Sequence, residues 1–236
     1  DLLLAGYAPN EVNFNMGRIS EIEGRLNDAQ VHYNAVRKNA DSQIYVSSRL
    51  RLAFVLSRTN MLHESLSILS ALGSSHPDEF IRISLIKADI LVENDKYSEA
   101  LDVLGDALKR VGFNVELLYA RSLVAEKLGR IDLMETDLGK ILEFDPNNVE
   151  ALNAMGYSLT NLTDRHNEAL IFIEKAFNLM PDSYHVLDSM GWVYFKLGKL
   201  DESIKYLRQA YFLVKDPEVA AHLIEALWAG GMRKEA

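Results

Sequence analysis

The sequence predicts an all-α protein made of stacked pairs of antiparallel helices. Three observations carry this prediction. A 34-residue frame of small and apolar positions recurs along the chain, from starts near residues 10, 46, 81, 115, 149, 184 and 217, so that successive starts lie 33 to 36 residues apart. Prolines at 77, 146, 181 and 217 stand at unit junctions, where a helix has to stop. Apolar residues recur at helical spacing, and no alternating strand pattern competes with it.

The units follow one another from the first residues onward. Residues 1–9 are expected to finish the helix of a preceding unit, and residues 10–236 to form one continuous array. Six units are complete, and the one that starts near 217 supplies only its first helix. Each unit keeps a small residue at position 8 of the frame and a large one at position 24. The pairs along the chain are Gly17 and Tyr33, Ala53 and Leu69, Ala88 and Leu104, Ser122 and Leu138, Gly156 and Ile173, and Gly191 and Leu207.

The sixth unit shows the expected internal plan of a repeat. Its first helix is predicted over about 183–196 and its second over about 201–214, with the turn LGKLD between them. Glycines at 24, 129 and 198 fall in such turns, where a left-handed residue ends a helix. The small residue at position 8 is expected to meet position 20 of the second helix, for example Gly191 against Ser203, so that the two backbones approach closely. The fifth unit carries one extra residue in the turn TDRHN.

The composition of the chain and the motifs that it lacks argue against several classes of function. The net charge of −9 argues against a nucleic-acid partner, which needs Lys and Arg to neutralise phosphates. No stretch approaches the length of an apolar membrane span, and no signal peptide is visible. The chain has no cysteine, no pair of histidines at ligand spacing and no nucleophile or phosphate-loop motif. We therefore predict no catalytic residue, no metal site and no cofactor. Both ends of the chain look like cuts through a longer protein.

These residues resemble the tetratricopeptide repeat (TPR). Small residues at positions 8 and 20, a large apolar residue at 24, a small or apolar residue at 27 and proline at 32 carry the resemblance over nearly the whole chain. Departures are greatest in the third and fourth units, where Asp95 replaces the turn glycine and Met134 stands at position 20. The resemblance implies a right-handed superhelical solenoid of stacked antiparallel helix pairs, with the first helix of each pair lining the concave face. It also implies a protein or peptide partner.

A narrower resemblance lies in the C-terminal third. The segments DPNNVEALNAMGYSLTNLTDRHNEALIFIEKAFNLMPDS and LDSMGWVYFKLGKLDESIKYLRQAYFL look like a block of large proteobacterial TPR lipoproteins. This resemblance implies a periplasmic adaptor, tethered to the outer membrane by a lipidated cysteine outside this chain. Its clients would be a carboxyl-terminal processing protease and the cell-wall hydrolases that the protease cleaves.

Candidate binding residues follow from the repeat geometry, in which positions 2, 5, 9, 12 and 13 of a first helix point into the groove. The candidates are Asn153, Tyr157, His185, Asp188, Trp192, Phe195, Lys196, Glu225 and Trp228. They are expected to form an aromatic strip flanked by acidic residues, with buried aromatic anchors supplying the affinity. The alternative, in which these aromatics pack into neighbouring repeats, stays open. A basic cluster of the kind that clamps a C-terminal carboxylate is not expected.

Other functions remain open at this stage. Similar repeat lipoproteins act in pilus or secretin assembly, which would keep the scaffold and change the client. The chain would otherwise be the repeat arm of a larger enzyme, such as a glycosyltransferase. Homo-oligomers formed through the open repeat ends are also compatible with the sequence.

Overall fold

The structure is a computed structural model that describes residues 9–38, 42–73 and 76–235. Within these ranges it contains thirteen α-helices and no strand, which confirms the all-α prediction. The chain divides into two compact units, residues 1–112 and 113–236. Residues 1–8, in which the end of a preceding repeat was expected, lie outside the described residues, and Pro9 opens the first helix.

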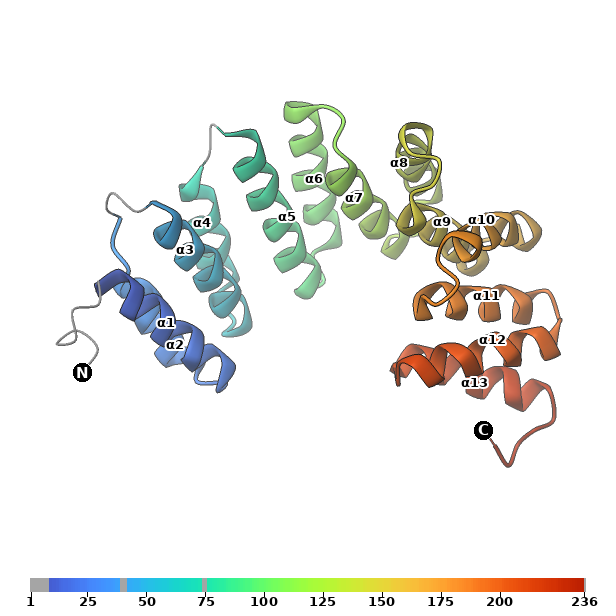
Figure 1. Ribbon diagram of the computed structural model, residues 1–236. Coiled ribbons are helices and arrows are strands. Elements are labelled where there is room, and N and C mark those ends of the chain that lie inside the picture. The colour runs from blue at the N-terminus through green and yellow to red at the C-terminus, as the bar shows by residue number, and fades with distance from the viewer. Residues whose placement is uncertain (1–8, 39–41, 74–75, 236) are drawn as a thin grey trace. The chain divides into compact units, whose positions relative to one another are not determined.

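The N-terminal unit consists of three antiparallel helix pairs (Figure 1). Their helices are α1 (Pro9–Ile22) and α2 (Leu26–Ala35), α3 (Ser42–Arg58) and α4 (Leu62–Leu72), and α5 (Pro77–Glu93) and α6 (Tyr97–Val111). The two longest helices of the unit, α3 and α5, begin four residues before the predicted starts at 46 and 81. For α5 the reason is visible in the sequence, because Pro77 fits the first helical position, where its missing N–H has no intrahelical partner to lose.

The C-terminal unit consists of three further pairs and a final single helix (Figure 1). The helices are α7 (Val115–Lys127) and α8 (Ile131–Phe144), α9 (Val149–Leu162) and α10 (His166–Leu179), α11 (Tyr184–Lys196) and α12 (Leu200–Leu213), and α13 (Pro217–Ala229). The first helices begin at the residues where the sequence frames start. Three of them have a side-chain N-cap, from Asn114, Asn148 and Asp216, which accepts hydrogen bonds from the first free backbone N–H groups.

The turns between paired helices take the left-handed conformation that the glycines predict. Gly24, Gly129 and Gly198 have φ of 74°, 66° and 75°. At the same place in the second and third pairs stand Asn60 and Asp95, with φ of 62° and 58°. Asn and Asp are the non-glycine residues that accept this conformation most readily, so the repeat survives the loss of glycine there.

Close packing inside a pair involves position 24 as well as the predicted position 20. Ser65 at position 20 donates to the carbonyl of Ala53 at position 8 at 2.7 Å, and a Cβ on Gly156 would lie 2.9 Å from the Ala169 carbonyl oxygen. A Cβ on Gly191 would overlap Leu207 Cγ and would lie 3.1 Å from the Leu207 backbone nitrogen. A Cβ on Gly17 would lie 2.5 Å from Tyr33 Cε1, and one on Gly156 would overlap Ile173. The three atoms nearest to such a Cβ on Gly191 all belong to Leu207. The glycine makes room for a large side chain of the second helix.

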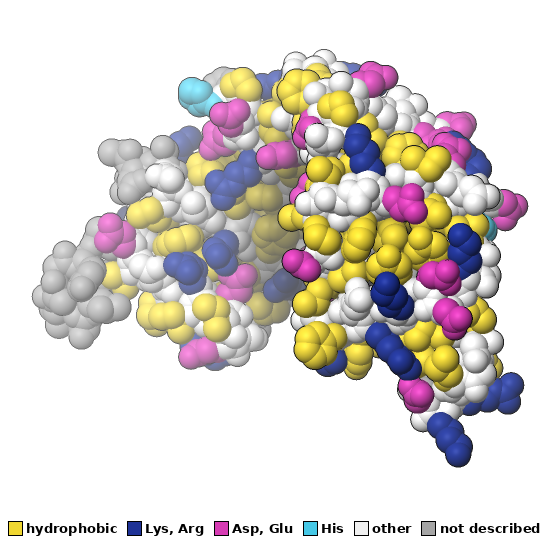
Figure 2. Space-filling model, turned by 45° about the vertical axis from the view of Figure 1, so that its right-hand side comes forward, with side chains coloured by type: hydrophobic (Ala, Val, Ile, Leu, Met, Phe, Trp, Pro, Cys, Tyr) yellow, Lys and Arg dark blue, Asp and Glu magenta, His cyan; other side chains and the backbone are white. Residues whose placement is uncertain are grey.

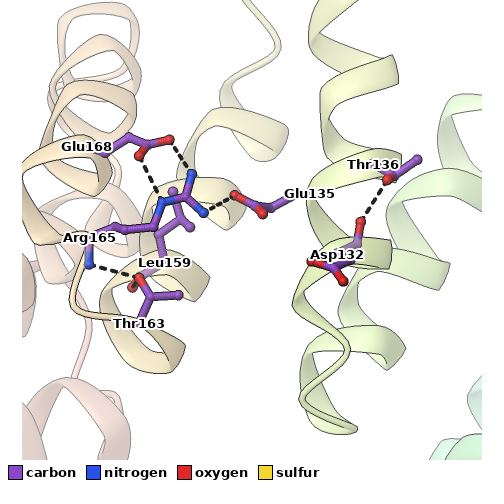
Figure 3. A network of polar contacts seen from close by, with 7 residues as sticks. All are labelled: Asp132, Glu135, Thr136, Leu159, Thr163, Arg165 and Glu168. Carbon is purple, nitrogen blue, oxygen red and sulfur yellow. Dashed lines mark hydrogen bonds and ion pairs between the residues drawn. The ribbon is translucent and has the colours of Figure 1, made fainter.

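The extra residue in the turn after α9 is accommodated by side-chain hydrogen bonds (Figure 3). Thr163 Oγ1 donates to the Leu159 carbonyl at 2.7 Å and accepts from the Arg165 backbone N–H at 3.0 Å. The guanidinium of Arg165 then reaches Glu168 on α10 and Glu135 on α8, at 2.5 Å each. Because these groups are partly exposed to solvent, the pairs fix the geometry of the turn more than they stabilise the fold.

A deeper ion pair joins α7 and α8. Arg121 donates two hydrogen bonds of 2.7 Å to the two carboxylate oxygens of Asp137, whose side chain is fully buried. This parallel geometry is the one in which a guanidinium compensates a buried carboxylate best. No helix in the described parts of the chain is long and apolar enough to cross a membrane.

Candidate partner-binding groove

The nine candidate residues all lie on the first helices of the last three repeats. Asn153 and Tyr157 are on α9, five of them on α11, and Glu225 and Trp228 on α13. The helices α9, α11 and α13 are neighbours in the C-terminal unit (Figure 1). The predicted arrangement, in which successive first helices carry the candidates, therefore holds at the level of the backbone.

A cavity of about 420 Å3 lies along these helices, and we call it the groove pocket. It brings together four of the nine candidates: Asn153, Tyr157, His185 and Asp188. The other lining residues are Tyr119, Leu123, Glu126 and Lys127 of α7, Ala154 of α9, Ser189 of α11 and Glu218 of α13. The repeat frame places Tyr119, Leu123 and Glu126 on the concave face, but they were not among the candidates because they form no ladder of similar residues with the next repeat.

Trp192 does not present its ring to the groove as predicted. Only 6% of the residue is exposed, because the indole packs between repeats. Its ring is stacked 4.0 Å from that of His222 and 5.0 Å from that of Phe195, and its Nε1–H donates to Asn161 Oδ1 at 2.7 Å. The Lys196 ammonium lies 4.5 Å from the indole centroid. The alternative of packing into the neighbouring repeat therefore applies to Trp192.

The predicted aromatic strip is replaced by a stack that runs through a histidine. Tyr157, His222, Trp192 and Phe195 follow one another, with 6.3, 4.0 and 5.0 Å between successive ring centroids. His222 was not a candidate. The signal for it was its spacing of 34 residues from Asp188, about one repeat, which places the two side chains on adjacent first helices.

The last two candidates lie outside both the stack and the groove pocket. Trp228 is 58% exposed, and the guanidinium of Arg233 lies 4.8 Å from its ring centroid. Glu225 is exposed on the same helix. Of the two candidate tryptophans, Trp192 is therefore buried and Trp228 is exposed.

Hydrogen bonds tie α13 to the two preceding first helices. Asp188 on α11 contacts His222 Nδ1 at 2.9 and 3.1 Å with its two oxygens. Tyr157 on α9 donates its hydroxyl to Glu218 Oε1. Three first helices therefore share one polar network at the edge of the groove pocket, and the network fixes the position of the two carboxylates that belong to it.

The groove pocket is acidic, and its acids are partly removed from water. Burial raises the pKa of Asp188, against the opposing effect of its hydrogen bond to His222. Burial also raises the pKa of Glu126, against the opposing effects of Lys127 and of a hydrogen bond to Ser158. The pKa values of Tyr119 and Tyr157 are raised first by burial and then by neighbouring carboxylates, among them Glu126 and Glu150 for the former and Glu218 and Asp188 for the latter. The dominant cause is desolvation of charge.

The N-terminal unit has a groove cavity of its own with the opposite charge. Its volume is about 410 Å3, and Phe14, Leu50, Phe54 and Ile86 supply apolar walls. Arg18, Arg51 and Arg82, from three successive first helices, line it together with Glu21 and Ser47. Arg51 is paired with Glu21 at 3.0 Å. The sequence gives no sign of this grouping, because the arginines are 33 and 31 residues apart along the chain and converge only through the repeat.

Comparisons with known proteins agree with the fold. A family profile described as tetratricopeptide repeat matches residues 115–148 and 184–211. A TPR repeat-containing protein of Pseudomonas aeruginosa is 38% identical over 213 residues, which is 90% of this chain and 36% of that protein. The chain thus spans about a third of the length of the curated relative it matches.

Within the parts that the structure describes, no three His, Asp or Glu side chains lie close enough together to hold a metal ion.

Solved structures share the helical arrangement at low sequence identity. A tetratricopeptide repeat protein of Parabacteroides merdae aligns with a TM-score of 0.73 and 20% identity over 96% of this chain and 88% of its own. A thermophilic TPR protein of Thermus thermophilus aligns with a TM-score of 0.58 and 22% identity over 68% and 85%. YrrB, described as a TPR protein with an unusual peptide-binding site, aligns with a TM-score of 0.53 and 23% identity over 75% and 91%.

Proposed function

This chain is a tetratricopeptide repeat protein, and we propose that it is a non-catalytic scaffold that holds a segment of a partner protein in the groove of its C-terminal unit. TPR repeats support a protein-interaction role. The observation that carries the choice of surface is the groove pocket, in which side chains from α7, α9, α11 and α13 converge. A partner segment lying there would contact four repeats at once.

The polar network supports the same surface. Asp188 and Glu218 are already held by His222 and Tyr157, so these carboxylates need little reordering when a partner arrives. A preorganised site loses less side-chain entropy on binding, which favours affinity. YrrB, described as having an unusual peptide-binding site, is a TPR protein of similar fold and so offers a precedent for peptide binding on it.

The finer proposal concerns the client and the location. We place the full-length protein in the bacterial periplasm, tethered to the outer membrane, where it would bind a carboxyl-terminal processing protease, its cell-wall hydrolase substrates, or both. The support is the resemblance of the C-terminal third to lipoprotein adaptors of this kind. The mechanism would be proximity, since one scaffold that holds two clients raises the effective concentration of each for the other.

A cross-linking pull-down of the full-length protein from its native cell tests the scaffold. The groove variant is Leu123→Ala with His185→Ala, because both residues line the groove pocket and both are exposed, so folding is preserved. We expect it to capture several-fold less partner. The matched control is Ile171→Ala with Phe212→Ala, which removes exposed apolar side chains from second helices of the same unit.

The control also tests a competing surface, the exposed apolar side chains of the second helices α10 and α12. Figure 2 shows hydrophobic side chains gathered on the face of the C-terminal unit that it presents, with Lys and Arg among them. If the control pair loses the partner and the groove pair keeps it, the groove is not the binding surface. The identity of the captured proteins decides among clients: a processing protease or cell-wall hydrolase supports the adaptor, whereas pilus or secretin components support the other assembly role.

The full-length gene tests the remaining alternative and the location. A lipobox cysteine near its start, together with recovery of the protein in the outer-membrane fraction, is the expected result. A catalytic domain downstream of Ala236 would instead make this chain the repeat arm of an enzyme.

A further inference from the structure

Three carboxylates reach the groove pocket from three different helices. Glu126 comes from α7, Asp188 from α11 and Glu218 from α13. Lys127 is the basic lining residue, so with neutral histidines the lining carries a formal charge of −2, from three acids and one base. Asp188 is 6% exposed and Glu126 is partly buried, which means that these charges are held in a medium that screens them poorly.

The protein compensates each of these three charges only in part. Asp188 contacts His222, and Glu218 accepts a hydrogen bond from the Tyr157 hydroxyl, which is a neutral donor. Glu126 has a hydrogen bond to Ser158, and burial still raises the pKa of its carboxyl group. Asp188 and Glu126 are partly desolvated and Glu218 lies exposed beside them, so the three converging carboxylates attract a positive group, whose arrival offsets the cost of burying the first two.

The walls of the groove pocket suit a long cationic side chain. Tyr119 and Tyr157 place aromatic rings beside the acids, and Leu123 and Ala154 add apolar surface for an alkyl stem. Aromatic faces attract ammonium and guanidinium groups, more strongly where water is displaced. Asn153 lines the same cavity, and its buried Oδ1 has no hydrogen-bond partner in the described structure. An arginine or lysine head group would supply the missing donor.

We infer that the groove pocket receives one arginine or lysine side chain of the bound partner segment, with Glu126 and Glu218 as its main anionic contacts and Tyr119 and Tyr157 beside its stem. The inference rests on the proposed function, since it assigns the chemistry of the partner at the same groove. Charge complementarity selects this occupant over an acidic segment, which the −2 lining would repel.

Two peptides that differ only in the charge of one side chain separate the effect of that charge from the effect of side-chain shape. The probe is acetyl-Ala-Ala-Arg-Ala-Ala-amide, and its control carries citrulline, a neutral isostere, in place of the arginine. Each is titrated into the isotopically labelled chain by NMR at pH 7 and low salt. We expect the arginine peptide to shift the resonances of α7, α9, α11 and α13 residues around the groove pocket, and the citrulline peptide to bind about tenfold more weakly or not at all.

Charge-neutralising variants locate the contact. Glu126→Gln and Glu218→Gln each retain an acceptor oxygen for Ser158 or Tyr157, so the folded network is preserved. Each is expected to weaken the arginine peptide about tenfold, whereas Glu143→Gln, an exposed acid on α8 of the same unit, leaves binding unchanged. Equal losses from all three variants would mean that only the net charge matters, and the inference would be wrong.

The outcomes separate this inference from the scaffold itself. If both peptides bind equally or neither binds, while Leu123→Ala with His185→Ala still lowers partner capture, the cationic anchor is refuted and the scaffold stands. If that pair leaves capture unchanged, the groove is not the partner surface. Arginine-peptide binding that depends on Glu126 and Glu218 would then confirm the pocket chemistry alone and remove its link to the partner.

Discussion

The indole of Trp192 and the imidazole of His222 lie almost parallel, with 4.0 Å between their centroids and 17° between their planes. One ring comes from α11 and the other from α13, the final helix, so the stack fastens the end of the array to the repeat before it. Asp188 holds the same imidazole from α11 through hydrogen bonds. Trp192 and Asp188, which lie on one face of α11, thus both contact His222 of the next repeat.

Trp192→Ala should therefore act on stability. Removing a large, almost fully buried ring costs about 3–5 kcal/mol in protein cores. We expect a lower thermal midpoint for the C-terminal unit, followed by far-ultraviolet circular dichroism, and faster amide exchange in α13. An unchanged melt would mean that the indole is not packed as the structure has it.

Trp228→Ala is the matched comparison. Because 58% of this residue is exposed, its removal should change the unfolding free energy by no more than about 0.5 kcal/mol. A partner pull-down with this variant then reports on binding alone. Loss of capture with an unchanged melt would retain Trp228 as a binding residue, and full capture would remove it from the candidate set.

A pair of glycine substitutions tests the contact with position 24. Gly191→Ala places a methyl group against Leu207, and overpacking of this kind costs about 1–3 kcal/mol, against the gain of helix propensity. Gly139→Ala, in the interior of α8, meets nothing within 4 Å and should gain up to about 1 kcal/mol. Urea unfolding of the two variants should give opposite signs; the same sign for both would contradict the packing described.

The buried ion pair of Arg121 and Asp137 gives a third prediction. Asp137→Ala leaves the guanidinium without its bidentate partner inside the α7–α8 pair, and breaking a buried pair in this way costs about 3–5 kcal/mol. Chemical denaturation measures the loss. The exposed pair of Asp106 and Lys109 serves as the control, and Asp106→Ala should leave the denaturation midpoint where it is. Similar effects from both would show that burial is not the cause.

The raised pKa of Glu126 predicts that this residue affects the stability of the fold in a pH-dependent way. Because the pKa of this carboxyl is raised in the folded state, the folded protein binds its proton more tightly than the unfolded chain does, and the charged form costs stability above that pKa. Glu126→Gln should therefore raise the melting temperature near pH 7. The gain should shrink as the pH falls toward the ordinary glutamate range and vanish below it.

Glu168 is the control with the opposite sign. Its pKa is lowered by the hydrogen bond from Arg165, so it contributes stability at neutral pH that is lost as the pH falls through its folded value. Glu168→Gln should lower the melting temperature slightly at pH 7 and not at all in acid. A gain from both substitutions at pH 7 would indicate a general charge effect instead of the local ones.

Most of the fold follows from sequence because each local signal repeats. The turn glycines, the junction prolines and the small residue at position 8 all point to the same helix pairs, and the first helices of the C-terminal unit start where the frames do. The helices α3 and α5 start a full turn before their frames; Pro77 marks the earlier start of α5, whereas no such residue stands at the start of α3.

The site was less predictable, for two physical reasons. Position in the repeat fixes the direction in which Trp192 leaves its helix, but its exposure depends on what the next repeat places over it, here His222. The second reason concerns charge. Arg51 and Arg82 look isolated along the chain, and only the stacking of α1, α3 and α5 gathers them with Arg18. Which side chains touch between repeats depends on the relative rotation of neighbouring helices, and the repeat frame does not specify this rotation.

The contact between Gly191 and Leu207 has a consequence for the way such chains vary. The two positions lie 16 residues apart, and the corresponding residues of the inserted unit, Gly156 and Ile173, lie 17 apart. The two residues share the space between the paired helices, and at Gly191 the room for an added methyl group is already filled by Leu207. Gly17 opposite Tyr33 is the extreme division, with no side chain on one side and a full aromatic ring on the other. The natural unit of substitution in this array is therefore the pair, and Gly191→Ala should be rescued by shortening Leu207.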